Sequence, residues 1–215
     1  MYGVITVLLL EIADVYLSEK IGVLESWASQ LLSNVAVPFC ILCFFHRTKQ
    51  IDFFDYGVSS KTGDYAYLEF VGAVAFCVAA WYITWTAFWF IGKLVADSYP
   101  MLSSIYITKK LIPEDSIWRL IATIYFALTS GIFEEIYYRG LPKVIAEQLG
   151  SANWKIYYVI LSSIAFGAIH WGRGFPMAMA NFGVGLVTAI LYLQIRDLRP
   201  LIGAHVVIDL IAFSG

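Results

Sequence analysis

The chain's most constraining feature is a series of apolar blocks, each roughly long enough to cross a bilayer. Seven blocks follow one another at residues 2–18, 22–45, 67–96, 117–148, 155–171, 176–195 and 200–214. About 20 apolar residues in a helix span the roughly 30 Å of hydrocarbon in a membrane. The sequence therefore predicts an all-α fold, a polytopic transmembrane helical bundle of about seven spans, built as a single membrane domain over residues 1–215.

Composition agrees with this prediction. Hydrophobic residues make up 60% of the 215 residues and charged residues only 14%, whereas a soluble domain carries roughly 25% charged residues. The formal net charge of -2 is too small to indicate a nucleic-acid partner. The first cation is Lys20, so the first block lacks the basic region of a cleaved signal peptide and is expected to stay in the bilayer.

The fourth block contains two adjacent carboxylates, Glu134 and Glu135, and one guanidinium, Arg139. Charge inside a spanning helix is costly unless it is paired, hydrated or close to the interface. Glu135 and Arg139 stand at i,i+4 with the acid first, which favours an ion pair on one helix face. Glu134 points about 100° away from that face. We therefore expect a Glu135–Arg139 clamp, and a Glu134 that desolvation tunes as a general base. The alternative is that both acids lie at a wet interface and end the span.

Two further blocks contain polar groups of the same kind. His170 ends the fifth block, and His205 and Asp209 share one face of the last block through i,i+4 spacing. An Asp in this position can orient a His and fix its tautomer. Alternatives remain: His170 as a hydrogen-bonded core histidine, and His205–Asp209 as an interhelical polar contact.

Helix lengths predict how deep these groups lie. If the fourth and fifth blocks form an antiparallel hairpin that turns near Ala152, Glu134 and His170 are equally far from the turn, about 25 Å, and face each other. His205 lies only about 10 Å inside its own block. The last helix must therefore tilt, begin deep in the bilayer, or meet a water-filled cavity.

These motifs resemble those of the CAAX protease and bacteriocin-processing (CPBP, or Abi) membrane proteins. The family's motifs E-E-x-x-x-R-G, F-x-x-x-H and H-x-x-x-N/D correspond here to Glu134, Glu135, Arg139, Gly140, Phe166, His170, His205 and Asp209. The resemblance covers roughly residues 115–213, which would carry the catalytic core. Residues 1–110 carry no such resemblance.

The resemblance implies an intramembrane endopeptidase of the glutamic type, with no cofactor. Glu134 and His170 would activate a water molecule, His205 and Asp209 would stabilise the oxyanion, and Glu135 would hold the helix geometry together with Arg139. Prenyl-protein-processing members often have Asn at the last position. An ionised Asp209 cannot donate a hydrogen bond, so we expect it to polarise His205 from behind.

The substrate implied is a membrane-associated peptide or protein cut near a terminus. Family substrates include prenylated C-terminal motifs, peptide pheromones, bacteriocin leaders and C-terminal sorting tags. The short chain, which ends six residues after Asp209, is expected to be a prokaryotic multi-pass protein of the cytoplasmic (inner) membrane. Its partners would be this substrate and the lipid bilayer, with no nucleic acid.

Other functions compete with this one. Glu134, His170 and His205 could ligate zinc with water in the open position, although H-E-x-x-H is absent. The scaffold could also serve a non-catalytic bacteriocin-immunity or regulatory protein, or an ion or proton transporter. A serine protease is disfavoured, since Ser130 and the pair Ser162–Ser163 lack a G-x-S-x-G context and are expected to be packing residues.

Overall fold

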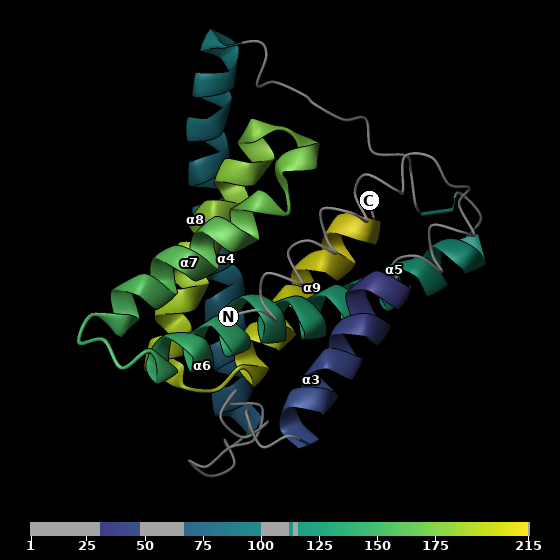
Figure 1. Cartoon of the computed structure of the whole chain (residues 1–215). Coiled ribbons are helices and arrows are strands. Elements are labelled where there is room, and N and C mark those ends of the chain that lie inside the picture. Colours follow the sequence, from purple (N-terminus) through teal and green to yellow (C-terminus); the bar gives the residue numbers. More distant parts are fainter. Residues whose placement is uncertain (1–30, 48–66, 100–111, 114–115, 215) are drawn as a thin grey trace.

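The structure, a computed structural model, describes residues 31–47, 67–99, 112–113 and 116–214 (Figure 1). Every element in these ranges is a helix, which confirms the all-α prediction for the described part of the chain. The α-helices are α3 (Val37–Arg47), α4 (Tyr67–Ser98), α5 (Ser116–Glu135), α6 (Leu141–Gln148), α7 (Trp154–Ala168), α8 (Phe175–Ile195) and α9 (Arg199–Ser214). Two π-helical turns, η1 (Leu31–Ala36) and η4 (Ile136–Gly140), and a 3-10 turn, η5 (Trp171–Arg173), complete the described elements.

Three segments of the described chain are long and apolar enough to cross a membrane: Tyr67–Ser98, Ile117–Gln148 and Phe175–Ile195. They indicate an integral membrane protein. The predicted count of about seven spans is not confirmed. Helices α7 and α9 have 15 and 16 residues, so their rise of about 22–24 Å is shorter than the hydrocarbon core. The block at 2–18 and the first part of the block at 22–45 lie outside the described residues.

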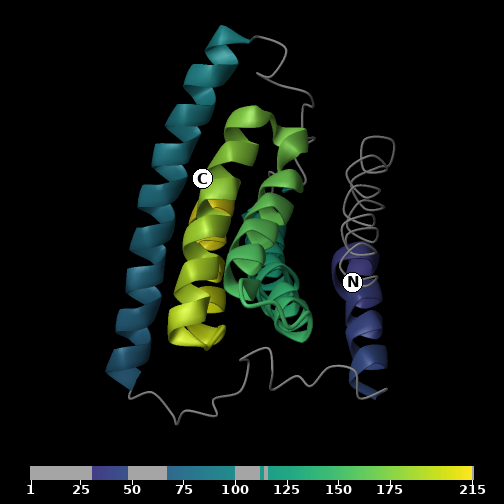
Figure 2. The same ribbon diagram turned by 60° about the vertical axis from the view of Figure 1, so that its left-hand side comes forward.

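Helix α8 lies between α4 and α7, and α5 packs along α9, which also contacts α4 (Figures 1 and 2). Helix α6 and the turn η4 pack against α7, whereas α5 packs along α9, so only the last part of the fourth block pairs with the fifth. In the view of Figure 1, α5 and α9 run obliquely to α4. The last helix is therefore inclined to α4, and the depth of His205 in the bilayer stays a prediction.

Glycines allow these helices to approach one another closely. A Cβ atom on Gly183 of α8 would lie 2.3 Å from the ring of Phe88 on α4, and one on Gly185 would lie 2.7 Å from Cα of Ser163 on α7. Small residues at helix contacts are a common basis of packing in membranes, where close backbone approach replaces the hydrophobic driving force. These two positions therefore hold α8 tightly between its neighbours.

The contact between α5 and α9 is equally close. A Cβ atom on Gly131 would lie 2.5 Å from Cγ2 of Val206 and 3.0 Å from its backbone nitrogen. Further along the pair, the hydroxyl of Thr123 donates to the carbonyl of Phe213 at 3.2 Å. The end of α5 that carries Glu134 is thereby fixed against α9.

The π turn η4 directly follows the two acids. The N–H of Leu141 bonds to the carbonyl of Ile136, five residues back. Pro142 has no N–H and cannot supply the donor that the Tyr138 carbonyl would receive in an α-helix. The hydroxyl of Ser162 on α7 donates to that carbonyl instead. Such π turns recur at functional sites, and this one ties the segment after the acids to α7.

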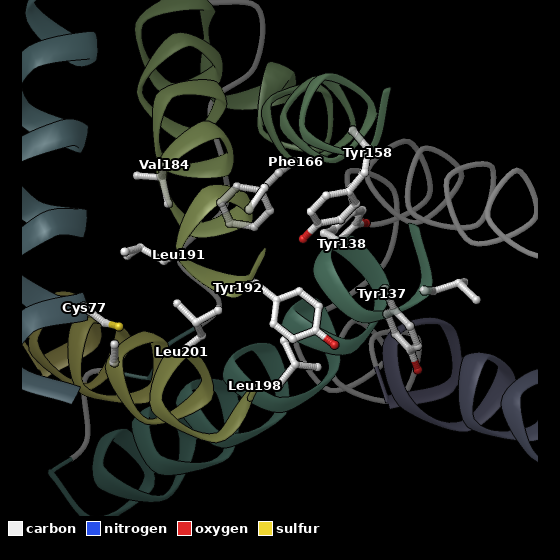
Figure 3. Close-up of a cluster of buried hydrophobic side chains, with 14 of the residues drawn as sticks. Cys77, Tyr137, Tyr138, Tyr158, Phe166, Val184, Leu191, Tyr192, Leu198 and Leu201 are labelled. Atoms are coloured by element: carbon white, nitrogen blue, oxygen red, sulfur yellow. The ribbon is translucent and has the colours of Figure 1, made fainter. Parts of the chain in front are cut away.

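A cluster of buried hydrophobic side chains joins these elements (Figure 3). It includes one residue from each of five elements, all at most 1% exposed: Cys77, Tyr138, Phe166, Tyr192 and Leu201. The phenyl ring of Phe166 is tilted against the ring of Tyr138, with centroids 5.7 Å apart. Phe166 is therefore a residue of the buried core as well as a neighbour of the polar cluster.

We expect Gly131→Ala to lower the melting temperature in detergent, because the added methyl group meets the backbone of Val206. Overpacking of this kind costs about 1–3 kcal/mol. Gly72→Ala is the matched control, since nothing lies within 4 Å of a Cβ atom added at that position, and it should be neutral or slightly stabilising. Equal melting temperatures for the two variants would contradict the close α5–α9 contact.

Candidate active site

Three carboxylates surround one imidazole where α5 meets α9. Nδ1 of His205 lies 2.8 Å from Oε1 of Glu135. Nε2 of the same ring lies 3.8 Å from Oε2 of Glu134 and 3.6 Å from Oδ2 of Asp209. The structure thus brings together four of the sequence-predicted residues, two from each helix.

Arg139 lies behind this group and is fully buried. Its Nε is 3.4 Å from Oε2 of Glu135, in the i,i+4 arrangement that the spacing favours. Nε and Nη2 donate to the hydroxyl of Thr188 on α8 at 2.9 and 2.8 Å, and the guanidinium lies 3.9 Å above the centre of the Phe166 ring. These contacts connect the end of α5 to α7 and α8.

The bond to Glu135 fixes the tautomer of His205. The Glu135 carboxylate, paired with Arg139, only accepts, so Nδ1 of His205 is the donor. The i,i+4 spacing predicts Asp209 in this position behind the ring. The structure instead has Glu135 of the neighbouring helix α5 at Nδ1, and Asp209 on the Nε2 side.

Asp209 is held by Ser130, whose hydroxyl is hydrogen-bonded to Oδ2 of the carboxylate. The same hydroxyl lies 2.6 Å from the carbonyl of Phe126. Ser130 is therefore more than the packing residue expected from its sequence context. Its position four residues before Glu134, on the same helix face, is the signal that could have placed it at the site.

His170 stands just beyond the end of α7. Its Nδ1 lies 2.9 Å from the carbonyl of Phe166, so Nδ1 donates and Nε2 of the neutral ring keeps a lone pair. The Phe166 ring lies 5.1 Å from the His170 ring and 6.1 Å from the His205 ring. Among the described residues no hydrogen bond or ion pair joins His170 to Glu134, and their role as a pair stays a prediction.

The cluster has a buried side and an open side. The side chain of Glu135 is 0% exposed and that of His205 is 4% exposed, whereas Glu134 is 24% and Asp209 16% exposed. Glu134 and Asp209 are therefore open at the surface of the cluster, and Glu135 is enclosed. This division matches a structural role for Glu135 and leaves Glu134 and Asp209 as the carboxylates that a reacting molecule can approach.

We expect Glu135→Gln to reduce folded yield and melting temperature, because it leaves the buried Arg139 without its ion-pair partner. Breaking one member of a buried pair costs about 3–5 kcal/mol. The control is Glu147→Gln, which removes the acid of the i,i+4 pair Lys143–Glu147 (3.1 Å, Glu147 40% exposed) and should cost about 0–1 kcal/mol. Equal stability of Glu135→Gln and the control would remove the clamp role.

One family model matches the part of the chain that contains this cluster. Residues 116–211 match the family model described as type II CAAX prenyl endopeptidase Rce1-like. No curated protein and no solved structure matches the chain. The matched range begins at α5 and ends in α9, and so contains every residue of the polar cluster. Through these residues the chain resembles the CPBP family of CAAX proteases and related membrane proteins.

Proposed function

We propose that the protein is a glutamic-type intramembrane endopeptidase, which cuts a membrane-associated peptide or protein near one of its termini. The matched family model implies a membrane protease. The observation that carries the finer proposal is the partly exposed Glu134 beside Nε2 of His205. The other nitrogen of that imidazole is held by the buried Glu135.

In the first step, Glu134 takes a proton from a water molecule while the water oxygen attacks the scissile carbonyl carbon. General-base assistance of this kind contributes about 10²–10⁴ in rate. His170 supports the step because its Nδ1 donates to the Phe166 carbonyl, which leaves Nε2 as an acceptor for the same water.

The negative charge that develops on the carbonyl oxygen needs a donor in a water-poor site. His205 supplies it from Nε2 when protonated, with Nδ1 anchored on Glu135. Asp209, 3.6 Å from Nε2, favours that imidazolium. The C–N bond then breaks, the proton held by Glu134 passes to the leaving amine, and a carboxylic acid and an amine are released.

We further propose that this is a multi-pass protein of a prokaryotic cytoplasmic membrane. The family description names prenylated CAAX substrates, so a farnesylated CAAX peptide is the first probe. A bacteriocin leader peptide and a C-terminal sorting-tag peptide complete the panel. Binding of a probe without cleavage would favour the non-catalytic immunity or regulatory function instead.

Glu134→Gln and His170→Ala are expected to abolish cleavage, with a fall in rate of at least about 100-fold. Neither change should prevent membrane insertion. Each change removes an acceptor for the water proton and leaves the buried Glu135–Arg139 pair in place. Product formation is followed by mass spectrometry of the probe peptide, and insertion by membrane fractionation.

Glu147→Gln again serves as the control. Glu147 lies on α6 in an exposed ion pair, so this variant should cleave the probe at the wild-type rate. Wild-type rates in Glu134→Gln or His170→Ala would refute the water-activating role of that residue.

We also propose that catalysis needs no metal ion. Among the described residues, no group of three or more His, Cys, Asp or Glu side chains is arranged to hold a metal. Activity is therefore expected to persist after chelation, with less than stoichiometric zinc in the purified protein by elemental analysis. Loss of activity on chelation and its return with added zinc would instead support the zinc site on Glu134, His170 and His205.

A further inference from the structure

An aromatic side chain from outside the family-matched residues packs on the polar cluster. Trp81 lies in α4, whereas the match begins at residue 116. Its indole is 4% exposed, and its ring centroid lies 4.5 Å from that of His205, with the planes inclined by 52°. It also lies edge-on to Phe166 at 6.0 Å and 88°. Trp81 therefore contacts the two rings at the centre of the site.

The indole is held firmly in this position because α4 is anchored on two helices. A Cβ atom on Gly92 of α4 would lie 2.8 Å from Cα of Pro176 on α8. Nearer the start of α4, a Cβ atom on Gly203 of α9 would lie 3.1 Å from Cγ2 of Val74. With close contacts on either side of Trp81 along the helix, α4 cannot withdraw from His205 without a loss of packing.

The surroundings of His205 differ from side to side. The charged groups that face it come from α5 and α9: Glu135 on Nδ1, and Glu134 and Asp209 on the Nε2 side. From α4 it meets the indole of Trp81. An aromatic ring against the imidazole limits its rotation, and its electron-rich face attracts a cation, most strongly when the ring is that of tryptophan.

We propose that Trp81 is a positioning residue for the hydrolysis. It keeps the His205 ring turned so that Nδ1 stays on Glu135 and Nε2 stays on the open side, and it stabilises the imidazolium that donates to the oxyanion. The effect on catalysis rests on the proposed function, while the effect on the ring's orientation does not.

The test compares Trp81→Phe, which keeps an aromatic face, with Trp81→Met, which keeps apolar bulk without one. Trp89→Met is the matched control, because Trp89 lies on the same helix and stacks on Trp85 at 6.2 Å and 12°. With the cleaved probe peptide, Trp81→Met should lower kcat about tenfold and leave KM within about twofold. Trp81→Phe should retain most of kcat, and Trp89→Met all of it.

A second readout needs no substrate. Diethyl pyrocarbonate labels accessible imidazoles. The intact, detergent-solubilised protein is labelled and then digested, and mass spectrometry of its peptides gives the labelling rate of each histidine. Trp81→Met should raise the rate at His205 several-fold relative to His170, whereas Trp81→Phe and Trp89→Met should keep the wild-type ratio.

The outcomes separate the two proposals. Wild-type kcat and wild-type His205 labelling in Trp81→Met would overturn the positioning role. Equal defects in Trp81→Phe and Trp81→Met, or a defect of the same size in Trp89→Met, would overturn it as well, because only general packing would then be at work. If the wild type cuts no probe while His205 labelling responds as expected, the proposed function fails and the positioning of the ring stands.

Discussion

The structure of the site depends on one buried interaction, in which Glu135 accepts from Nδ1 of His205 at 2.8 Å and pairs with Arg139 at 3.4 Å. A lone carboxylate at this depth would be strongly unfavourable, and a lone guanidinium equally so. Together with Thr188 and the Phe166 ring, the pair becomes the junction of α5, α7, α8 and α9. Removing one charge would therefore disturb both the bundle and the histidine.

The same junction explains how two neighbouring acids come to play different roles. Glu134 and Glu135 point in directions about 100° apart around the helix, so one is enclosed by neighbouring helices and the other faces the open side. The π turn that follows contains Arg139 and keeps it in the ion pair with Glu135. The chain then continues as α6, with Pro142 near its start. A sequence of two identical residues thus yields a support and a candidate catalyst.

Contacts within one helix could be predicted from the sequence better than contacts between helices. The helices at 67–98, 116–148 and 175–195, and the i,i+4 contact of Glu135 with Arg139, follow from apolar length and from the 3.6-residue period. For Nδ1 of His205, the period favours Asp209 of the same helix as the acceptor, because periodicity contains no information about a neighbouring helix. The spacing of Ser130 to Glu134 could place Ser130 at the site, but its contact with Asp209 could not be predicted. The contact of Trp81 with His205 escapes sequence-based prediction for the same reason.

The open side of the cluster has a consequence for the end of a catalytic cycle. Hydrolysis of a neutral amide produces a carboxylate, and here that new anion would form beside Glu134 and Asp209, the two acids with 24% and 16% of their side chains exposed. Like charges at such short range repel each other strongly where the local dielectric is low. In the proposed reaction, this arrangement would accept an uncharged peptide bond and repel the acidic product, which would favour turnover over product inhibition.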